Sequence, residues 1–249
     1  MEVIQGDCIE GMGRMPPGEV NLIIADPPYG IGMADWDSWS DEQMLAFLQK
    51  AFHILVEGGT LLVWGSPCQT LLCKLIINAV GVGFEHKQLL SWCYTQGGDA
   101  RTSSMRHYAT RHENLAWLIK PGTHKFHALK GASHYSEAEI RTALAKAPGR
   151  VSRESLARGR PPRSWFDVPR VNSRSLERAH GHHPCQKPLE LCRMLVEVHS
   201  DPGDIVVVPF GGSGSEAIAA RMAERKVICF EICEEYVGMI LARSRSIIT

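Results

Sequence analysis

Asp26-Pro27-Pro28-Tyr29 is the stretch whose residue types and spacing are best suited to chemistry. It directly follows an apolar run, residues 20–25, that predicts a short buried strand. Because the two prolines restrict the next turn, they hold one carboxylate acceptor and one aromatic face at the end of this strand, where α/β sheets bind ligands. A flat heterocycle with an amino group, such as a nucleobase, would suit this arrangement. A proline-rich turn in which Tyr29 only covers the sheet edge is the alternative.

A second candidate site is the glycine-rich loop Pro209-Phe210-Gly211-Gly212-Ser213-Gly214, which joins an apolar strand pattern to a helix pattern that begins at Ser215. Glycines let the backbone approach a ligand closely, and the N-terminus of the following helix offers free amides to a carboxylate or phosphate. Glu231 ends the next strand pattern, where an acidic side chain commonly binds ribose hydroxyls. The loop indicates a nucleotide-like ligand; a tight turn and a solvated charge are the alternatives.

The elements that must position these two sites alternate between strand and helix patterns. We expect strands at 3–5, 20–25, 60–64, 88–94, 115–119, 205–208 and 227–230. We expect helices from Ser40 to the Gly58-Gly59 pair, and at 67–79, 136–146, 188–199, 215–224 and 234–244. This alternation predicts an α/β fold with a mostly parallel sheet covered by helices on both faces.

The formal net charge of zero hides a division of charge along the chain. Residues 101–180 hold 16 Lys and Arg against 6 Asp and Glu, with aromatic residues interleaved, whereas the remainder is acidic by the same margin. A basic insert of this kind predicts a polyanionic partner, most simply nucleic acid. The candidate nucleic-acid contacts are Arg101, Arg106, Arg111, Lys125, Lys130, Arg160 and Arg163. A solvated loop whose charges pair with the acidic body is the alternative.

Length and composition exclude several other classes of protein. A chain of 249 residues suits one α/β domain with an insertion, which we place at 1–100 and 181–249 for the domain and 101–180 for the insert. No apolar run approaches membrane-spanning length, and the start lacks the pattern of a signal peptide. The eight cysteines form no CxxC pair, which favours buried free thiols in a reducing cytosol. The histidines of the insert lack convincing ligand spacing, so we predict no metal site.

Four motifs follow one another along the chain: Gly6-Asp7, the Asp26–Tyr29 tetrapeptide, the stretch His183-Pro184-Cys185-Gln186-Lys187-Pro188, and Phe210-x-Gly212-x-Gly214. In this order they resemble the exocyclic amino DNA methyltransferases. The catalytic tetrapeptide precedes a basic variable region and then the cofactor loop, as in the β group of that family. The resemblance covers nearly the whole chain. It implies a Rossmann-like, S-adenosylmethionine-dependent methyltransferase fold with a circularly permuted sheet and an inserted target recognition region.

The resemblance also implies a role for each matched residue. The Asp26 carboxylate and Pro27 carbonyl would accept hydrogen bonds from the target amino group, Pro28 would stiffen the turn, and Tyr29 would stack on the flipped base. Asp7, with Cys8 beside it, would hold the cofactor adenine, and Glu231 would hold its ribose. The methionine arm would contact the loop and, through its carboxylate, Lys187; the loop residues are Phe210, Gly211, Gly212, Ser213 and Gly214.

Two positions depart from the family pattern. Val208 stands where an acidic residue usually precedes Pro-Phe, and Cys185 replaces the commoner threonine. The Pro-Cys pairs at Cys68 and Cys185 imitate the nucleophile of C5-cytosine methyltransferases, but the cofactor loop follows both cysteines instead of preceding them.

The resulting hypothesis is sequence-specific methylation of double-stranded DNA at adenine N6. The aspartate at the head of the tetrapeptide favours adenine, since serine is common there in the cytosine N4 enzymes. Cytosine N4, an RNA or protein acceptor, and a catalytically silent DNA-binding protein remain the alternatives. The resemblance favours a homodimer, and we expect a cytoplasmic location for a bacterial or phage-encoded protein. The enzyme could be an orphan or half of a restriction system.

Overall fold

The computed structural model describes residues 1–29, 39–65, 69–94, 110–128, 135–160, 162–172, 175–179, 181 and 183–246. Its strands are β1 (Glu2–Gln5), β2 (Val20–Ala25), β3 (Leu55–Gly65), β4 (Glu85–Cys93), β5 (His112–Ile119), β6 (Trp165–Asp167), β7 (Ile205–Val208) and β8 (Lys226–Glu231). Its α-helices are α1 (Cys8–Gly13), α2 (Asp41–Ile54), α3 (Gln69–Val82), α4 (Glu137–Lys146), α5 (Arg153–Ala157), α6 (Leu189–His199), α7 (Ser215–Met222) and α8 (Glu234–Ser246). A short 3₁₀ helix covers Leu176–Arg178.

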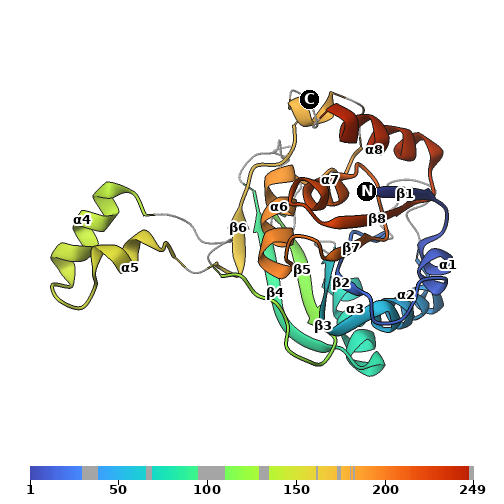
Figure 1. Ribbon diagram of the computed structural model, residues 1–249, viewed down its shortest axis with the longest axis horizontal. Helices are drawn as coiled ribbons and strands as arrows, with labels where there is room; N and C mark the ends of the chain where they lie inside the picture. Colours follow the sequence, from blue (N-terminus) through green and yellow to red (C-terminus); the bar gives the residue numbers. More distant parts are fainter. Residues whose placement is uncertain are drawn as a thin grey trace, which may run out of the picture.

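The strands form one mixed sheet in the order β1-β8-β7-β2-β3-β5-β4-β6. The neighbours from β1 to β3 are parallel, and β5 runs antiparallel between β3 and β4. The last two parallel strands of the chain, β7 and β8, therefore lie between β1 and β2 (Figure 1). This confirms the predicted permuted α/β sheet. The strand order reverses between β7 and β2, which is where open α/β sheets bind ligands.

Helices cover both faces of the sheet because successive side chains of each buried strand point to opposite sides. Leu22 and Ile24 of β2 belong to the core cluster under α6, α7 and α8. Ile23 and Ala25 belong to the cluster under α1, α2 and α3. All four side chains are fully buried. The two cores fix β2 from both sides and so fix the position of the tetrapeptide that follows it.

The Gly58-Gly59 pair does not end a helix, contrary to the sequence prediction. Helix α2 ends at Ile54, and β3 begins at Leu55 without an intervening turn. The pairing of β2 with β3 shifts register here, and a Cβ on Gly58 (φ +74°) would lie 2.1 Å from the Thr123 carbonyl oxygen. The glycines therefore permit an irregularity inside β3, where the loop at Thr123 approaches the backbone closely.

Part of the predicted insert lies in the sheet, and part projects from it. β5 and β6 are strands of the main sheet, while α4 and α5 form a helical pair that extends away from the body (Figure 1). The α4 helix begins as predicted, because Ser136 and Glu139 form a capping box. The sequence patterns did not predict α1, α5, β6 or the 3₁₀ helix. The division at 101 and 180 stays a prediction.

Candidate active site

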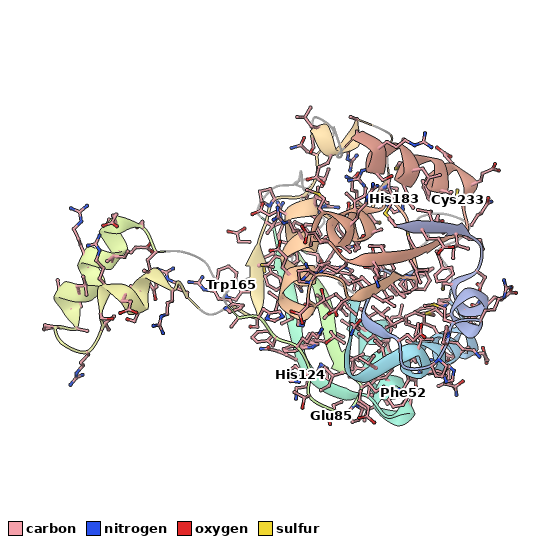
Figure 2. The ribbon with its side chains drawn as sticks, viewed as in Figure 1. Phe52, Glu85, His124, Trp165, His183 and Cys233 are labelled. Carbon is pink, nitrogen blue, oxygen red and sulfur yellow. The ribbon has the colours of Figure 1, made fainter. Side chains whose placement is uncertain are left out.

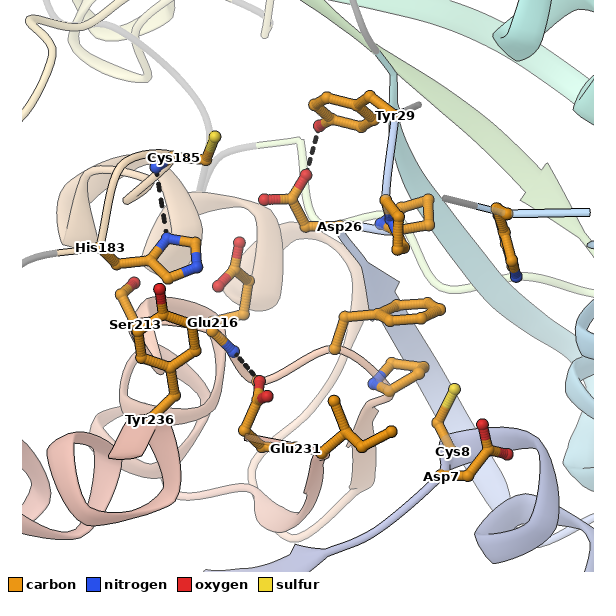
Figure 3. A pocket seen from close by; sticks show the side chains of 18 of the residues that line it. Asp7, Cys8, Asp26, Tyr29, His183, Cys185, Ser213, Glu216, Glu231 and Tyr236 are labelled. Atoms are coloured by element: carbon orange, nitrogen blue, oxygen red, sulfur yellow. Dashed lines mark hydrogen bonds between the residues drawn. The ribbon is translucent and has the colours of Figure 1, made fainter. Parts of the chain in front are cut away.

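A cavity of about 250 Å³ opens at the carboxyl ends of β1, β8, β7 and β2 (Figure 3). These strands are neighbours in the sheet, so residues that are far apart in the sequence meet at one edge. The cavity is lined by the tetrapeptide 26–29, by the stretch 209–213, and by Asp7, Glu216 and Glu231. The structure thus brings the two candidate sites of the sequence into one cavity.

The Asp26 carboxylate is held on both of its oxygens. Lys187 Nζ donates to Oδ2 over 2.6 Å, and the Tyr29 hydroxyl donates to Oδ1. Burial and the adjacent Asp26 carboxylate raise the pKa of Tyr29 well above its usual value of 10, so this hydroxyl remains a donor. A carboxylate has about four acceptor positions, which leaves Asp26 able to accept a further hydrogen bond from a ligand amino group.

Lys187 lies between two carboxylates and is almost completely buried, with 2% of its side chain exposed. Its Nζ is 2.6 Å from Asp26 Oδ2 and 3.2 Å from Glu113 Oε2. Although burial opposes the charge, Asp26 and Glu113 raise the pKa of Lys187 well above 10.5. Lys187 is therefore a fixed cation that orients Asp26. Its predicted contact with a cofactor carboxylate stays a prediction.

The glycine-rich loop approaches its neighbours too closely for larger residues. A Cβ on Gly211 would lie 2.8 Å from the Ile240 side chain and 2.9 Å from Cys229 Sγ. Gly212 and Gly214 have φ of +49° and +80°, in the left-handed region that favours glycine. The loop backbone is thus exposed to a ligand on one side and packed on the other.

Phe210 fixes the apolar wall of the cavity through ring contacts. Its ring centroid lies 5.6 Å from that of Trp39 and 5.6 Å from that of Phe47 on α2. Trp39 also lines the cavity, and it was not singled out in the sequence. A planar ligand group can pack against this wall.

The carboxylates of Glu231 and Asp7 accept hydrogen bonds from backbone amides at the cavity. Glu231 accepts from the Gly212 amide over 2.6 Å and from the Cys233 amide over 2.8 Å. Asp7 caps α1, accepting from the amides of residues 9 and 10. Burial raises the pKa of Cys8 to about 12, so its thiol stays neutral. Both carboxylates keep acceptor capacity for hydroxyl or amino donors.

Glu216 is a cavity residue that sequence reasoning missed. It stands in the first turn of α7 and is 4% exposed. Burial, and next the nearby Asp26, raise the pKa of Glu216 to about 7. Glu113 was also missed, since an acidic residue within an apolar strand carries no motif. For both Glu216 and Glu113, the only signal in the sequence was an acidic residue within a segment whose pattern otherwise predicts a buried element.

Residues 20–242 match the model of the N6/N4 methyltransferase family, described as "DNA methylase". This match spans most of the chain. The protein belongs to the N6/N4 DNA methylase family. It is 28% identical over 254 residues to the DNA adenine methyltransferase YhdJ of Escherichia coli K12, covering 97% of this chain and 81% of that protein.

Solved structures share the fold of this methylase. The PvuII DNA methyltransferase, described as cytosine-N4-specific, superposes with a TM-score of 0.74 at 18% identity, covering 97% of this chain and 85% of that one. The M1.HpyAVI–SAM complex superposes with a TM-score of 0.64 at 18% identity, covering 98% of both chains. The shared fold includes the mixed sheet at whose edge the cavity lies.

The predicted DNA contacts of the methylase fall in different surroundings. Arg163 is exposed, and its guanidinium lies 4.9 Å from the Trp165 ring. Trp165 stands on β6 (Figure 2). Arg160 pairs with Glu139 at 2.6 Å, and Lys125 pairs with Asp201 and Asp204. Arg111 directly precedes β5 and is partly buried. Arg101, Arg106 and Lys130 lie outside the described residues.

The pairing of Lys125 with Asp201 and Asp204 agrees with the alternative interpretation, in which basic residues of the insert pair with acidic residues of the main domain. Arg163 instead offers an exposed charge beside an aromatic face. In the described part of the methylase, no helix has the length and apolar character needed to cross a membrane. The same residues contain no group of three or more His, Cys, Asp or Glu placed to hold a metal ion.

Proposed function

We propose that this DNA methylase transfers a methyl group from S-adenosylmethionine to the N6 amino group of an adenine flipped out of duplex DNA. The observation that carries the proposal is the position of Asp26, held by Lys187 and Tyr29 inside the cavity that also contains the glycine-rich loop. Adenine is favoured by the aspartate at the head of the tetrapeptide. The name of the 28% identical adenine methyltransferase supports the same base.

The cavity suits the proposed cofactor. Glu231 and Asp7 provide carboxylate acceptors for ribose hydroxyls and the adenine amino group. The loop at Gly211 and Gly212, which has no room for side chains, leaves its backbone accessible to the methionine arm. When bound, S-adenosylmethionine supplies a methyl group on an electrophilic sulfonium, so the protein needs neither a metal nor a covalent nucleophile.

Asp26 acts on the acceptor side of the reaction. An adenine amino nitrogen is a weak nucleophile because its lone pair is delocalised into the ring. The Asp26 carboxylate and the Pro27 carbonyl accept hydrogen bonds from its two N–H groups, which favours a pyramidal nitrogen with its lone pair directed at the methyl group. Holding two reactants in line in this way can lower a barrier by about 7–11 kcal/mol. Tyr29 stacks on the flipped base and offsets part of the cost of extruding it.

Lys187 and Glu113 keep the Asp26 carboxylate oriented. Without Lys187, this carboxylate would lose the contact that fixes its direction towards the acceptor position. The 2.6 Å contact of Lys187 with Asp26 holds it in place, and Glu113 holds the lysine from its other side.

Methyl transfer by the purified chain tests this proposal. The chain is incubated with isotopically labelled S-adenosylmethionine and either duplex DNA or tRNA, and the products are digested to nucleosides for mass spectrometry. We expect labelled N6-methyladenine from DNA alone. Labelled N4-methylcytosine without N6-methyladenine would overturn the assignment of the base, and transfer to tRNA alone would overturn that of DNA.

A further inference from the structure

One carboxylate of the cavity has a buried oxygen without a hydrogen bond. Glu216 Oε1 is inaccessible to solvent and has no hydrogen-bond partner among the described residues. The other acidic side chains of the cavity are all engaged. Asp7 accepts from two amides, Asp26 accepts from Lys187 and Tyr29, and Glu231 accepts from two amides. A buried acceptor left unsatisfied is costly, so a donor that the chain itself does not supply would stabilise the Glu216 carboxylate.

The position of Glu216 indicates which donor this is. Figure 3 shows its carboxylate between Asp26, on the side of the methyl acceptor, and Glu231, on the side of the proposed ribose. Glu216 belongs to the segment in which the glycine-rich loop continues into α7. An amino-acid arm lying along that loop would have Glu216 as a neighbour, because Glu216 and the loop line the same cavity. Such an arm carries one strong cationic donor, the α-ammonium group, with three N–H bonds.

The end of the preceding strand offers no charge for this ammonium group. Val208 is the last residue of β7, is 1% exposed and packs in the core cluster with Leu22 and Ile24. It therefore leaves the cavity without the carboxylate that the family pattern leads one to expect there. Glu216, eight positions further along the chain, is a carboxylate that reaches the same cavity from the helix.

We propose that Glu216 is the residue that binds the α-ammonium group of S-adenosylmethionine. This assignment rests on the cofactor part of the proposed function and adds a contact that none of the motifs in the sequence provides. Because the carboxylate must be ionised to bind a cation strongly, binding is linked to loss of a proton from Glu216, whose pKa is raised to about 7 by burial and by Asp26.

Several groups face Glu216 and contribute to its field. They are Asp26 after β2, Lys187 before α6, Cys192 on α6, Cys229 on β8 and Arg243 on α8. Asp26 disfavours ionisation of Glu216, whereas Lys187 and Arg243 favour it. A cation from a ligand, added to Lys187 and Arg243, therefore completes a partly balanced cluster of charges around Glu216.

The test compares ligands with and without the amine by isothermal titration calorimetry of the full chain. S-adenosylhomocysteine carries the ammonium group, and 4-(5′-adenosylthio)butanoate keeps the carboxylate but lacks it. We expect Glu216→Gln to weaken binding of S-adenosylmethionine and S-adenosylhomocysteine about 10- to 100-fold, as for the loss of a charged hydrogen bond. Binding of the butanoate should change less than threefold. Glu190→Gln, on exposed α6 surface, is the matched control and should change neither.

Other results would overturn the assignment. Equal losses for S-adenosylhomocysteine and the butanoate would mean that Glu216 supports the fold, and a loss confined to S-adenosylmethionine would place it at the sulfonium.

If Glu216→Gln does not fold, the pH dependence of binding to the wild-type chain still tests the assignment. From pH 7.5 to 5.5 its affinity for S-adenosylhomocysteine should fall about 20-fold while that for the butanoate changes less than threefold. The same pH dependence for both ligands contradicts the proposal. Failure of the wild-type chain to bind S-adenosylmethionine at all would contradict the proposed cofactor itself.

Discussion

Replacing Lys187 with methionine would leave the carboxylates of Asp26 and Glu113 without the cation between them. Removing one partner of a buried ion pair costs about 3–5 kcal/mol. Lys187 is 2% exposed, but Asp26 and Glu113 keep 17% and 14% of their side chains exposed, which favours the low end of this range. We therefore expect Lys187→Met to lower the free energy of unfolding by about 3 kcal/mol, or the melting temperature by roughly 6–12 °C.

Urea unfolding followed by circular dichroism at pH 7.5 measures this loss. Lys74→Met is the control, because Lys74 pairs with Asp41 at 2.5 Å while 47% and 60% of the two side chains are exposed. An exposed pair contributes at most about 1 kcal/mol. Adding Glu113→Gln to Lys187→Met should recover about 1–2 kcal/mol, since it removes one surplus charge. A loss in Lys187→Met no larger than that in Lys74→Met would refute the argument that this cation supports the site.

The pH dependence gives a second check on the same lysine. The folded-state pKa of Lys187 is raised above its unfolded value of 10.5, so its stabilisation is complete below pH 10.5 and disappears as the pH rises through the folded-state pKa. The difference in unfolding free energy between wild type and Lys187→Met should thus stay constant from pH 7.5 to 9.5. A difference that already vanishes by pH 9.5 would show that Lys187 does not hold its proton.

Three further substitutions test other parts of the site. Gly211→Ala should destabilise the fold by about 1–3 kcal/mol in thermal melts because its Cβ meets the Ile240 side chain, whereas Gly81→Ala, with no neighbour within 4 Å, should not; equal melting temperatures would contradict this. Tyr29→Ala should lower kcat/KM for DNA about 10- to 100-fold by removing a stacking face. Tyr29→Phe keeps that face and loses only the hydroxyl contact with Asp26, which Lys187 still holds, so it should lose clearly less activity than Tyr29→Ala in steady-state assays; equal losses would exclude stacking. Arg163→Ala should weaken DNA binding alike for all sequences and reduce the salt slope of the binding constant by about one, and an unchanged slope would remove this residue from the interface.

The sequence was most informative where a motif follows a strand. The Asp26–Tyr29 stretch, the 209–214 loop and Glu231 each follow or end a short apolar run. Local patterns predicted where each of them stands relative to its strand, whereas their grouping into one site and the permuted strand order came from the family resemblance. The parallel pairing of Glu2–Gln5 on β1 with residues 228–231 on β8 agrees with that order.

What the sequence could not predict depends on long-range contacts or on ambiguous residues. Glu113 reaches Lys187 only because β5 runs antiparallel beside β3, and no local pattern reveals that pairing. A pair of glycines such as Gly58-Gly59 is compatible both with the end of a helix and with an irregular strand, so the sequence could not distinguish the two. Helix α1 is six residues long, too short for a clear period, and its cap Asp7 was interpreted only as a ligand contact. Glu216 resembles any acidic residue in a first helical turn.

The central claim is that Asp26 presents the amino group of a flipped adenine to the methyl donor. Single-molecule sequencing of DNA from cells that express the wild-type chain or Asp26→Ala tests it most directly, because it reports the modified base and its sequence together. We predict N6-methyladenine at one short recognition sequence with the wild-type chain, and none with Asp26→Ala although the variant still binds DNA. Methylation that persists in Asp26→Ala, or N4-methylcytosine alone with the wild-type chain, would contradict the account.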